Sequence, residues 1–147
     1  MRLWHYKLLP YLPDAQFKGQ LREMVAILHD WRDKGQTNHL LINLVMEYPK
    51  TELLRYFAYY CVVYDSRYGK LPHKDYRLEF LDFANMESMV FTDKLYARWH
   101  DQKYLRVCMA NLYEKYYFGM GKSQISEAEW RRLLQGYRDI TGEDYCI

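Results

Sequence analysis

The feature that most constrains the fold is a run of apolar residues at helical spacing near the start of the chain. Between Pro13 and Gly35 these residues recur at intervals of four and three, at Phe17, Leu21, Met24, Leu28 and Trp31. This spacing aligns them in one stripe along an α-helix. Asp14 is suited to cap the start of the helix and Gly35 to end it. The segment 14–34 is therefore predicted to be an amphipathic helix that buries one face.

Similar patterns predict further helices over 38–48, 50–68, 78–89, 101–118 and 126–137. The signals between residues 70 and 100 are weaker, so 78–89 is one helix or two short ones. Ser126 and Glu129 form a capping box at the start of the last helix. No repeat, low-complexity tract or long linker interrupts the chain. We predict an all-α fold, with residues 1–147 as a single compact domain of about five to seven helices.

The composition limits the function less than it limits the fold. Half of the 147 residues are apolar or aromatic, which is enough for a sizeable core. The 16 tyrosines, with 4 tryptophans and 6 phenylalanines, exceed what a small core requires, so some of these rings are expected to face a ligand or a partner. The net charge of +2 is not that of a strongly basic domain, so any DNA site must be a local patch.

Cysteines, histidines and hydropathy indicate no disulfide framework, metal or membrane span. The three cysteines (Cys61, Cys108 and Cys146) are far apart and are expected to be free thiols in a reducing cytoplasm. The five histidines include no pair at i, i+4 spacing that would indicate zinc, and we expect no metal and no cofactor. No segment has about 18 consecutive apolar residues, and the stretch MRLWHYKLLPYLP has no long apolar run that ends in a small-residue cleavage site. We expect a cytoplasmic monomer with no membrane association.

Helical geometry separates two charged residues on the first predicted helix. With the apolar stripe as reference, Glu23 lies about 120° away, in a polar track with Gln16, Gln20 and Asp30. Arg22 lies on the opposite flank, about 140° from the stripe. Glu23 is therefore expected at the edge of the buried face and Arg22 on the exposed surface, although charged residues at such positions are most often ordinary solvated helix surface.

Short motifs in a fixed order resemble a known family. The segment from Leu12 to Glu23 resembles the opening helix of the phage pyrimidine-dimer DNA glycosylase family called endonuclease V, in the spacing of its leucine, its aspartate and its Arg-Glu pair. MRLWH, PYLP, GQLRE and His39-x-x-x-Asn43 are similar to a bacterial branch of that family. The phage resemblance runs from Met1 to about residue 70, and the bacterial one extends to the Asn111-Leu-Tyr-Glu-Lys-Tyr stretch.

The resemblance implies a DNA repair glycosylase with abasic-site lyase activity on damaged double-stranded DNA. The nucleophile it implies is the α-amine of Met1, which attacks C1′ of the damaged nucleotide, and Glu23 is the essential carboxylate. An α-amine has a pKa near 7.7 to 8.0, so roughly a quarter of it is neutral at cytoplasmic pH, against about a thousandth of a lysine. By the same resemblance Arg2 and Arg22 hold phosphates beside the lesion.

The chain departs from the phage pattern at several positions. Because Arg2 is bulky, methionine aminopeptidases are expected to spare Met1, and a retained formyl group would abolish the chemistry. Gln16 and Ala26 occupy the positions of a family histidine and a second arginine, so part of the DNA-binding surface of the phage enzyme is missing. The aromatic, lysine-containing tail is matched only weakly by the segment 113–117, and residues 118–147 follow it.

Other residues are candidates for binding. Lys115, Tyr116 and Tyr117 are the best candidates for DNA contacts, although aromatic runs more often belong to the core. His5, Gln16, His39 and Asn43 are pocket candidates. His39 and Asn43 are one helical turn apart, and their alternative interpretation is a capping or hydrogen-bonding pair. For the whole chain, the alternative to the enzyme is a non-catalytic helical module that binds DNA or another protein.

Overall fold

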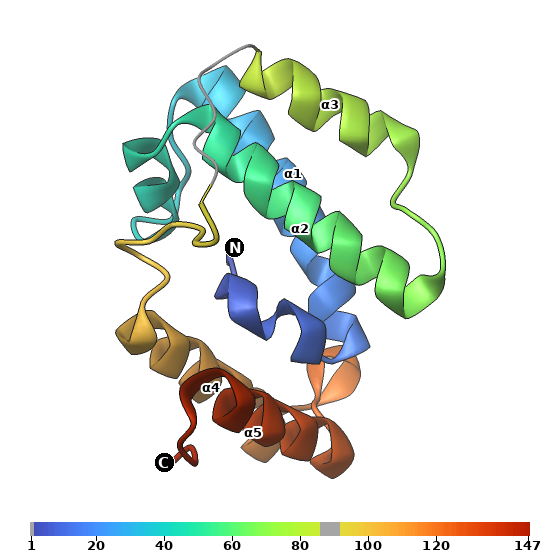
Figure 1. Cartoon of the computed structure of the whole chain (residues 1–147), viewed down its shortest axis with the longest axis vertical. Coiled ribbons are helices and arrows are strands. Elements are labelled where there is room, and N and C mark those ends of the chain that lie inside the picture. Colours follow the sequence, from blue (N-terminus) through green and yellow to red (C-terminus); the bar gives the residue numbers. More distant parts are fainter. Residues whose placement is uncertain (1, 86–91) are drawn as a thin grey trace. The chain divides into compact units, whose positions relative to one another are not determined.

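The chain folds into α-helices joined by turns and short 3-10 segments. The computed structural model describes residues 2–85 and 92–147, and these residues contain no strand. The elements in chain order are η1 (Tyr6–Tyr11), α1 (Asp14–Lys34), η2 (Ile42–Glu47), α2 (Lys50–Tyr68), α3 (Lys74–Ala84), α4 (Gln102–Tyr117), η3 (Gly121–Ser123) and α5 (Glu127–Thr141) (Figure 1). The prediction of an all-α fold is confirmed.

Four of the predicted helices lie where their sequence patterns place them, and two differ. The segment 38–48 holds only the 3-10 segment η2, not an α-helix. Helix α3 begins at Lys74, earlier than predicted, because the side chain of His73 caps it by accepting a hydrogen bond from the N–H of Asp75. The predicted end of that helix, at Met89, lies outside the described residues. The start of the chain, where no helix is predicted, contains η1.

The residues group into two compact units, each made of separated segments. Unit 1 consists of Met1–Leu3 and Leu21–Trp99, and unit 2 of Trp4–Gln20 and His100–Ile147. Helix α1 therefore contributes its first turns to unit 2 and the rest to unit 1. The assignment of residues 1–147 to a single domain stays a prediction.

The core of unit 1 is aromatic. Helices α2 and α3 run side by side, joined by a turn that Gly69 begins with a φ of 69° (Figure 1). Between them the rings of Phe57 and Phe80 stack at 4.1 Å. Trp31 on α1 meets Phe83 on α3 edge to face, with ring centroids 5.3 Å apart. These contacts bury apolar area and hold the three helices of this unit together.

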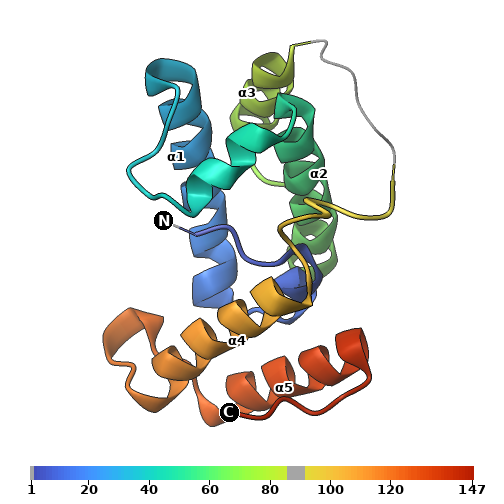
Figure 2. The same cartoon turned by 90° about the vertical axis from the view of Figure 1, so that its left-hand side faces the viewer.

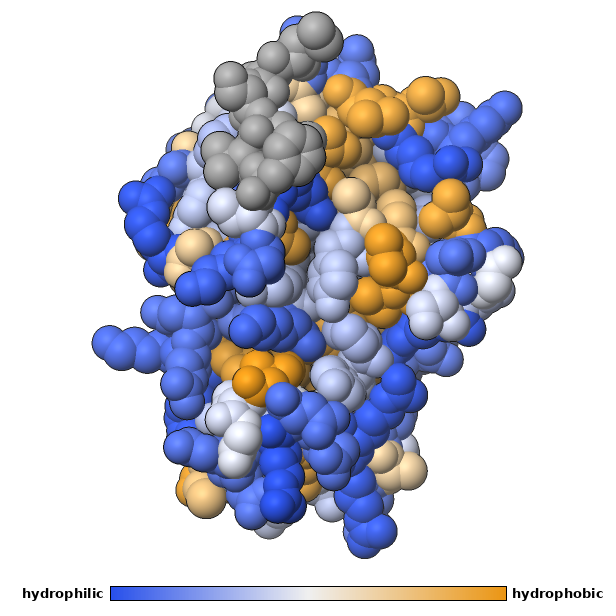
Figure 3. All heavy atoms as spheres, in the orientation of Figure 1, coloured by the Kyte–Doolittle hydropathy of each residue, from blue (hydrophilic) through white to orange (hydrophobic). Residues whose placement is uncertain are grey.

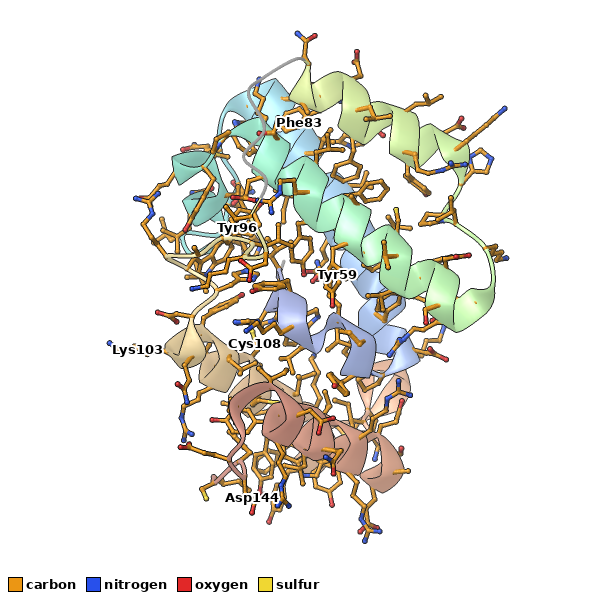
Figure 4. The ribbon with its side chains drawn as sticks, viewed as in Figure 1. Tyr59, Phe83, Tyr96, Lys103, Cys108 and Asp144 are labelled. Atoms are coloured by element: carbon orange, nitrogen blue, oxygen red, sulfur yellow. The ribbon has the colours of Figure 1, made fainter. Side chains whose placement is uncertain are left out.

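A second cluster in unit 1 surrounds Tyr96, which precedes α4. The Tyr96 ring is fully buried and packs against Tyr48, Tyr56 and Trp99 (Figure 4). Arg55 on α2 holds this segment by donating hydrogen bonds to the carbonyl oxygens of Thr92 and Lys94. The same guanidinium pairs with the half-buried carboxylate of Glu52 at 2.5 Å. The segment is thus fixed by both ring packing and charge-assisted hydrogen bonds.

Unit 2 is built on α4, α5 and the N-terminal segment. Helices α4 and α5 lie side by side (Figure 2), and Trp130 on α5 packs against Tyr113 and Tyr116 on α4. Segment η1 packs on α5 where Gly136 leaves room, because a Cβ atom there would lie 2.5 Å from Cγ of Tyr11. In Figure 4, Cys108 on α4 lies among packed side chains and Lys103 points outward.

The surface has several exposed apolar side chains. Hydrophobic surface gathers over α2 and α3 in Figure 3, where Val62, Leu78 and Leu81 are exposed. In residues 2–85 and 92–147 no helix is long and apolar enough to cross a membrane. The three cysteines are free thiols, as predicted, with Cys146 exposed and the other two buried.

Candidate active site

Glu23 lies at the border between the buried and exposed faces of α1. Met24 and Leu28 are fully buried, Arg22 is exposed, and Glu23 is half-buried. The Oε2 atom of Glu23 is shielded from solvent and has no hydrogen-bond partner among the described residues. Buried polar atoms in native proteins nearly always have a partner, and a carboxylate without one is a candidate functional group. The helical geometry thus places Arg22 in solvent and Glu23 beside the core.

The N-terminal segment is tied to the helix that carries Glu23. Leu3 and Trp4 are buried, and Arg2 is half-buried. The backbone N–H of Trp4 donates a hydrogen bond of 2.7 Å to the Oε1 atom of Gln20, which is itself buried. Gln20 precedes Glu23 by three residues on α1. Met1, the proposed nucleophilic residue, lies outside the described residues.

His5 is part of an aromatic stack in unit 2. Its ring stacks with Tyr6, His100 and Tyr104, and its Nδ1 atom accepts a hydrogen bond from the N–H of Lys7, which caps η1. Burial lowers the pKa of His5 to about 4. Burial also lowers the pKa of His100, whose Nδ1 accepts a hydrogen bond from the N–H of Tyr6. Both rings are therefore neutral at pH 7 and join the N-terminal segment to the start of α4.

Gln16 is buried and anchors the turn after α4. Its Nε2 atom donates a hydrogen bond of 3.0 Å to the carbonyl oxygen of Ser123. Its Oε1 atom is buried and has no partner among the described residues. At the position where the phage family carries a histidine, this chain therefore has an amide that is hydrogen-bonded to the backbone of the turn after α4.

Asn43 and His39 have different roles in the loop after α1. Oδ1 of Asn43 accepts hydrogen bonds from the backbone N–H and the hydroxyl of Thr37, both at 2.8 Å, and Nδ2 donates to the carbonyl of Thr37. The side chain of His39 is exposed, and only its backbone joins this network. Asn43 therefore fixes the loop by hydrogen bonds, while His39 is open to solvent.

At the aromatic end of α4, likewise, one candidate residue is packed and another is exposed. Tyr116 stacks on Trp130 with an angle of 9° between the rings, so it belongs to the packing between α4 and α5. Tyr117 is exposed and leans on Tyr113. Lys115 lies in the last turn of α4.

The two units divide the predicted site residues between them. Unit 1 contains Arg2, Arg22, Glu23, His39 and Asn43, and unit 2 contains His5, Gln16, Lys115, Tyr116 and Tyr117. No group of three or more His, Cys, Asp or Glu side chains suited to a metal occurs in the described part of the chain. The structure adds Gln20 and Thr37, whose side chains organise the backbone at the two ends of α1. The polar track on α1 was the sequence signal for Gln20.

Fold and site together define an all-helical protein with a partly buried carboxylate on its first long helix and an N-terminal segment that is hydrogen-bonded to the first turns of the same helix. The family model for pyrimidine dimer DNA glycosylase matches residues 1–75, which include α1, α2 and both of these features. The chain belongs to the pyrimidine dimer DNA glycosylase family. Neither a curated protein nor a solved structure matches it.

Proposed function

We propose that the chain is a DNA glycosylase with abasic-site lyase activity, acting on pyrimidine dimers or a related lesion in duplex DNA. Membership of the pyrimidine dimer DNA glycosylase family supports the substrate class. The observation that carries the mechanism is the shielded Oε2 atom of Glu23, a carboxylate oxygen with no partner among the described residues. The nucleophile in this proposal is the α-amine of Met1, and Arg2 and Arg22 contact the phosphates beside the lesion.

The reaction balances without a metal or an external oxidant. The amine nitrogen bonds to C1′ while the bond from C1′ to the base breaks, and the base leaves with the electron pair and takes up a proton. The amine then loses a proton, and its lone pair opens the bond from C1′ to the ring oxygen. The oxygen keeps the bonding pair and takes up a proton to become a hydroxyl, and the nitrogen and C1′ form a protonated imine. Removal of a C2′ proton sends electrons into the imine, and elimination expels the 3′ phosphate. Hydrolysis of the imine restores the amine.

Glu23 contributes charge and proton transfer in this scheme. A carboxylate near the developing cationic sugar stabilises it, and the same group can move protons during imine formation and elimination. The half-buried position of Glu23 strengthens its electrostatic effect compared with a fully solvated carboxylate. Arg22 is exposed, as a phosphate contact requires.

Borohydride trapping tests the proposal on two duplexes, one with a pyrimidine dimer and one with an abasic site. We expect the native protein to form a covalent adduct that peptide mass spectrometry assigns to the first residue. An N-terminally extended form should form none, and Glu23→Gln should lower the trapping rate about 100-fold or more. Asp30→Asn is the matched control, because Asp30 follows Glu23 on the polar track of α1 and pairs with Lys34.

The outcomes separate the parts of the proposal. No adduct with the native protein on either duplex would overturn the amine mechanism and favour the non-catalytic DNA-binding module. An adduct on the abasic duplex alone would leave the lyase and remove the dimer. Equal trapping by Glu23→Gln and the native protein would exclude Glu23 as the essential carboxylate.

A further inference from the structure

Helix α3, which lies entirely within unit 1, is apolar on its outer face as well as on its inner one. The inner face buries Phe80 against α2 and Phe83 against α1. On the outer face Leu78 and Leu81, about one helical turn apart, have exposed fractions of 60% and 57%, and Figure 3 shows apolar surface along this helix. A surface helix normally has a polar outer face, so exposed leucines there indicate a second partner.

The charges beside these leucines form two rows of opposite sign. At about 100° per residue, Asp75 and Asp82 lie on one flank of Leu78, and Lys74 and Arg77 lie on the other. Neither Arg77 nor Asp82 forms an ion pair with another described residue. The Nε atom of Arg77 is shielded from solvent and has no hydrogen-bond partner among the described residues. Both flanks therefore offer charge to a partner outside this chain.

A second copy of α3 in parallel orientation complements both the leucines and the charges. When two identical helices pack in the same direction about a twofold axis, the acidic flank of each lies opposite the basic flank of the other, as in parallel coiled coils. Arg77 of one copy then lies beside Asp82 of the other, and Lys74 lies beside Asp75. In an antiparallel pair, flanks of like charge would meet, so the charge pattern favours the parallel orientation.

We propose that the outer face of α3 is a self-association surface, at which two copies of the chain pack Leu78 and Leu81 between parallel α3 helices. The monomer expected from the sequence is then the state at low concentration. A helix of 11 residues offers less area than a standard interface, so we expect a dimer dissociation constant of about 10 µM to 1 mM. The inference does not depend on the proposed function, because α3 lies almost wholly beyond the matched family segment, residues 1–75.

Sedimentation equilibrium of the full chain tests the apolar part of the surface. We expect the native protein to pass from monomer to dimer between about 5 µM and about 1 mM. The double variant Leu78→Ala/Leu81→Ala should associate about tenfold more weakly or worse, because it removes the apolar contact. The matched control is Leu40→Ala/Leu41→Ala, two leucines outside α3 with exposed fractions of 90% and 46%, which should associate like the native protein.

Charge exchange tests the parallel pairing. Arg77→Glu and Asp82→Lys should each weaken association about tenfold, because like charges then face each other in the dimer. An equimolar mixture of the two variants should associate nearly as well as the native protein, since each flank again meets its opposite. The same two substitutions combined in one chain should also restore association, which an antiparallel pair would not allow. Because Asp82 is exposed, Asp82→Lys keeps the fold, and added salt should recover part of its association by screening.

Each outcome decides for or against the surface. A native protein that stays monomeric up to about 1 mM overturns the proposal. So does a dimer that forms equally well in Leu78→Ala/Leu81→Ala, or one that only the control variant weakens. Loss of association in Asp82→Lys that neither the partner variant nor salt recovers overturns the parallel pairing. A misfolded variant would not be rescued by mixing, so recovery in the mixture reports on the contact between copies and supports the proposal.

Discussion

The amide oxygen of Gln20 accepts a hydrogen bond of 2.7 Å from the backbone N–H of Trp4, and both groups are buried. This contact joins the third peptide unit after Met1 to the helix that carries Glu23. In an enzyme that uses its own terminal amine as the nucleophile, such a contact restricts the range of positions that the amine can occupy.

Replacing Gln20 should therefore slow the chemistry as well as reduce stability. Gln20→Leu leaves the buried N–H of Trp4 without its acceptor, which should cost about 1–3 kcal/mol in the free energy of unfolding. We expect borohydride trapping to fall about tenfold at saturating DNA, with little change in DNA affinity. Gln20→Glu keeps an acceptor oxygen and should recover part of the rate. An undiminished trapping rate in Gln20→Leu would show that the contact is only structural.

The buried histidines predict that stability falls in mild acid. The folded-state pKa of His5 is about 4 and the usual value is 6.5, so on acidification the unfolded chain takes up the proton first. The contribution of His5 is complete above pH 6.5 and is lost as the pH falls towards 4. Urea unfolding should show a loss of about 2 kcal/mol between pH 7 and pH 5 from this residue.

His100 changes stability in the same direction, because burial also lowers its pKa. In the variant His5→Phe the dependence on pH should be weaker. A native profile that is flat from pH 7 to pH 5 would contradict the buried, neutral state of both rings.

Gly136 should not tolerate a methyl group. Its Cβ would lie 2.5 Å from Cγ of Tyr11, an atom fixed in the middle of the side chain, so η1 would have to move away from α5. Alanine is the better helix former by about 1 kcal/mol, yet overpacking at this distance should outweigh that gain. We expect Gly136→Ala to lower the free energy of unfolding by about 1–2 kcal/mol. The double variant Gly136→Ala/Tyr11→Ala should recover part of the loss.

Substitutions of Asn43 and of His39 should have different effects on the free energy of unfolding. Asn43→Ala removes the acceptor of the N–H and hydroxyl of Thr37 and should cost about 1–2 kcal/mol. His39→Ala should change stability by less than about 0.5 kcal/mol, because its side chain is exposed. If His39→Ala nevertheless weakens DNA binding, its role is contact with the ligand. Equal stability losses in the two variants would contradict the division.

The sequence patterns located the helices best where start and stop signals agree with the apolar period. Helix α5 begins at the capping box of Ser126 and Glu129, α4 is capped by Asp101, and α2 ends before Gly69. The pattern was misleading over 38–48, where Thr37 and Asn43 bond to each other and leave only a 3-10 segment. The cap of α3 was missed because histidine is an unusual capping residue.

The site was predictable to the level of the helix face. Periodicity placed Glu23 beside the buried stripe and Arg22 in solvent, as the structure has them. It could not indicate that Gln20 bonds to Trp4, or that Gln16 holds the turn after α4, because both contacts join segments far apart in the chain.

The composition of unit 2 also affects how the protein is made. Residues 4–20 meet their partners in segments beyond residue 100, through bonds such as Tyr6 to His100 and Pro10 to Arg132. During synthesis these contacts can therefore form only after most of the chain has been made. During that interval residues 4–20 lack the partners that they have in the folded protein.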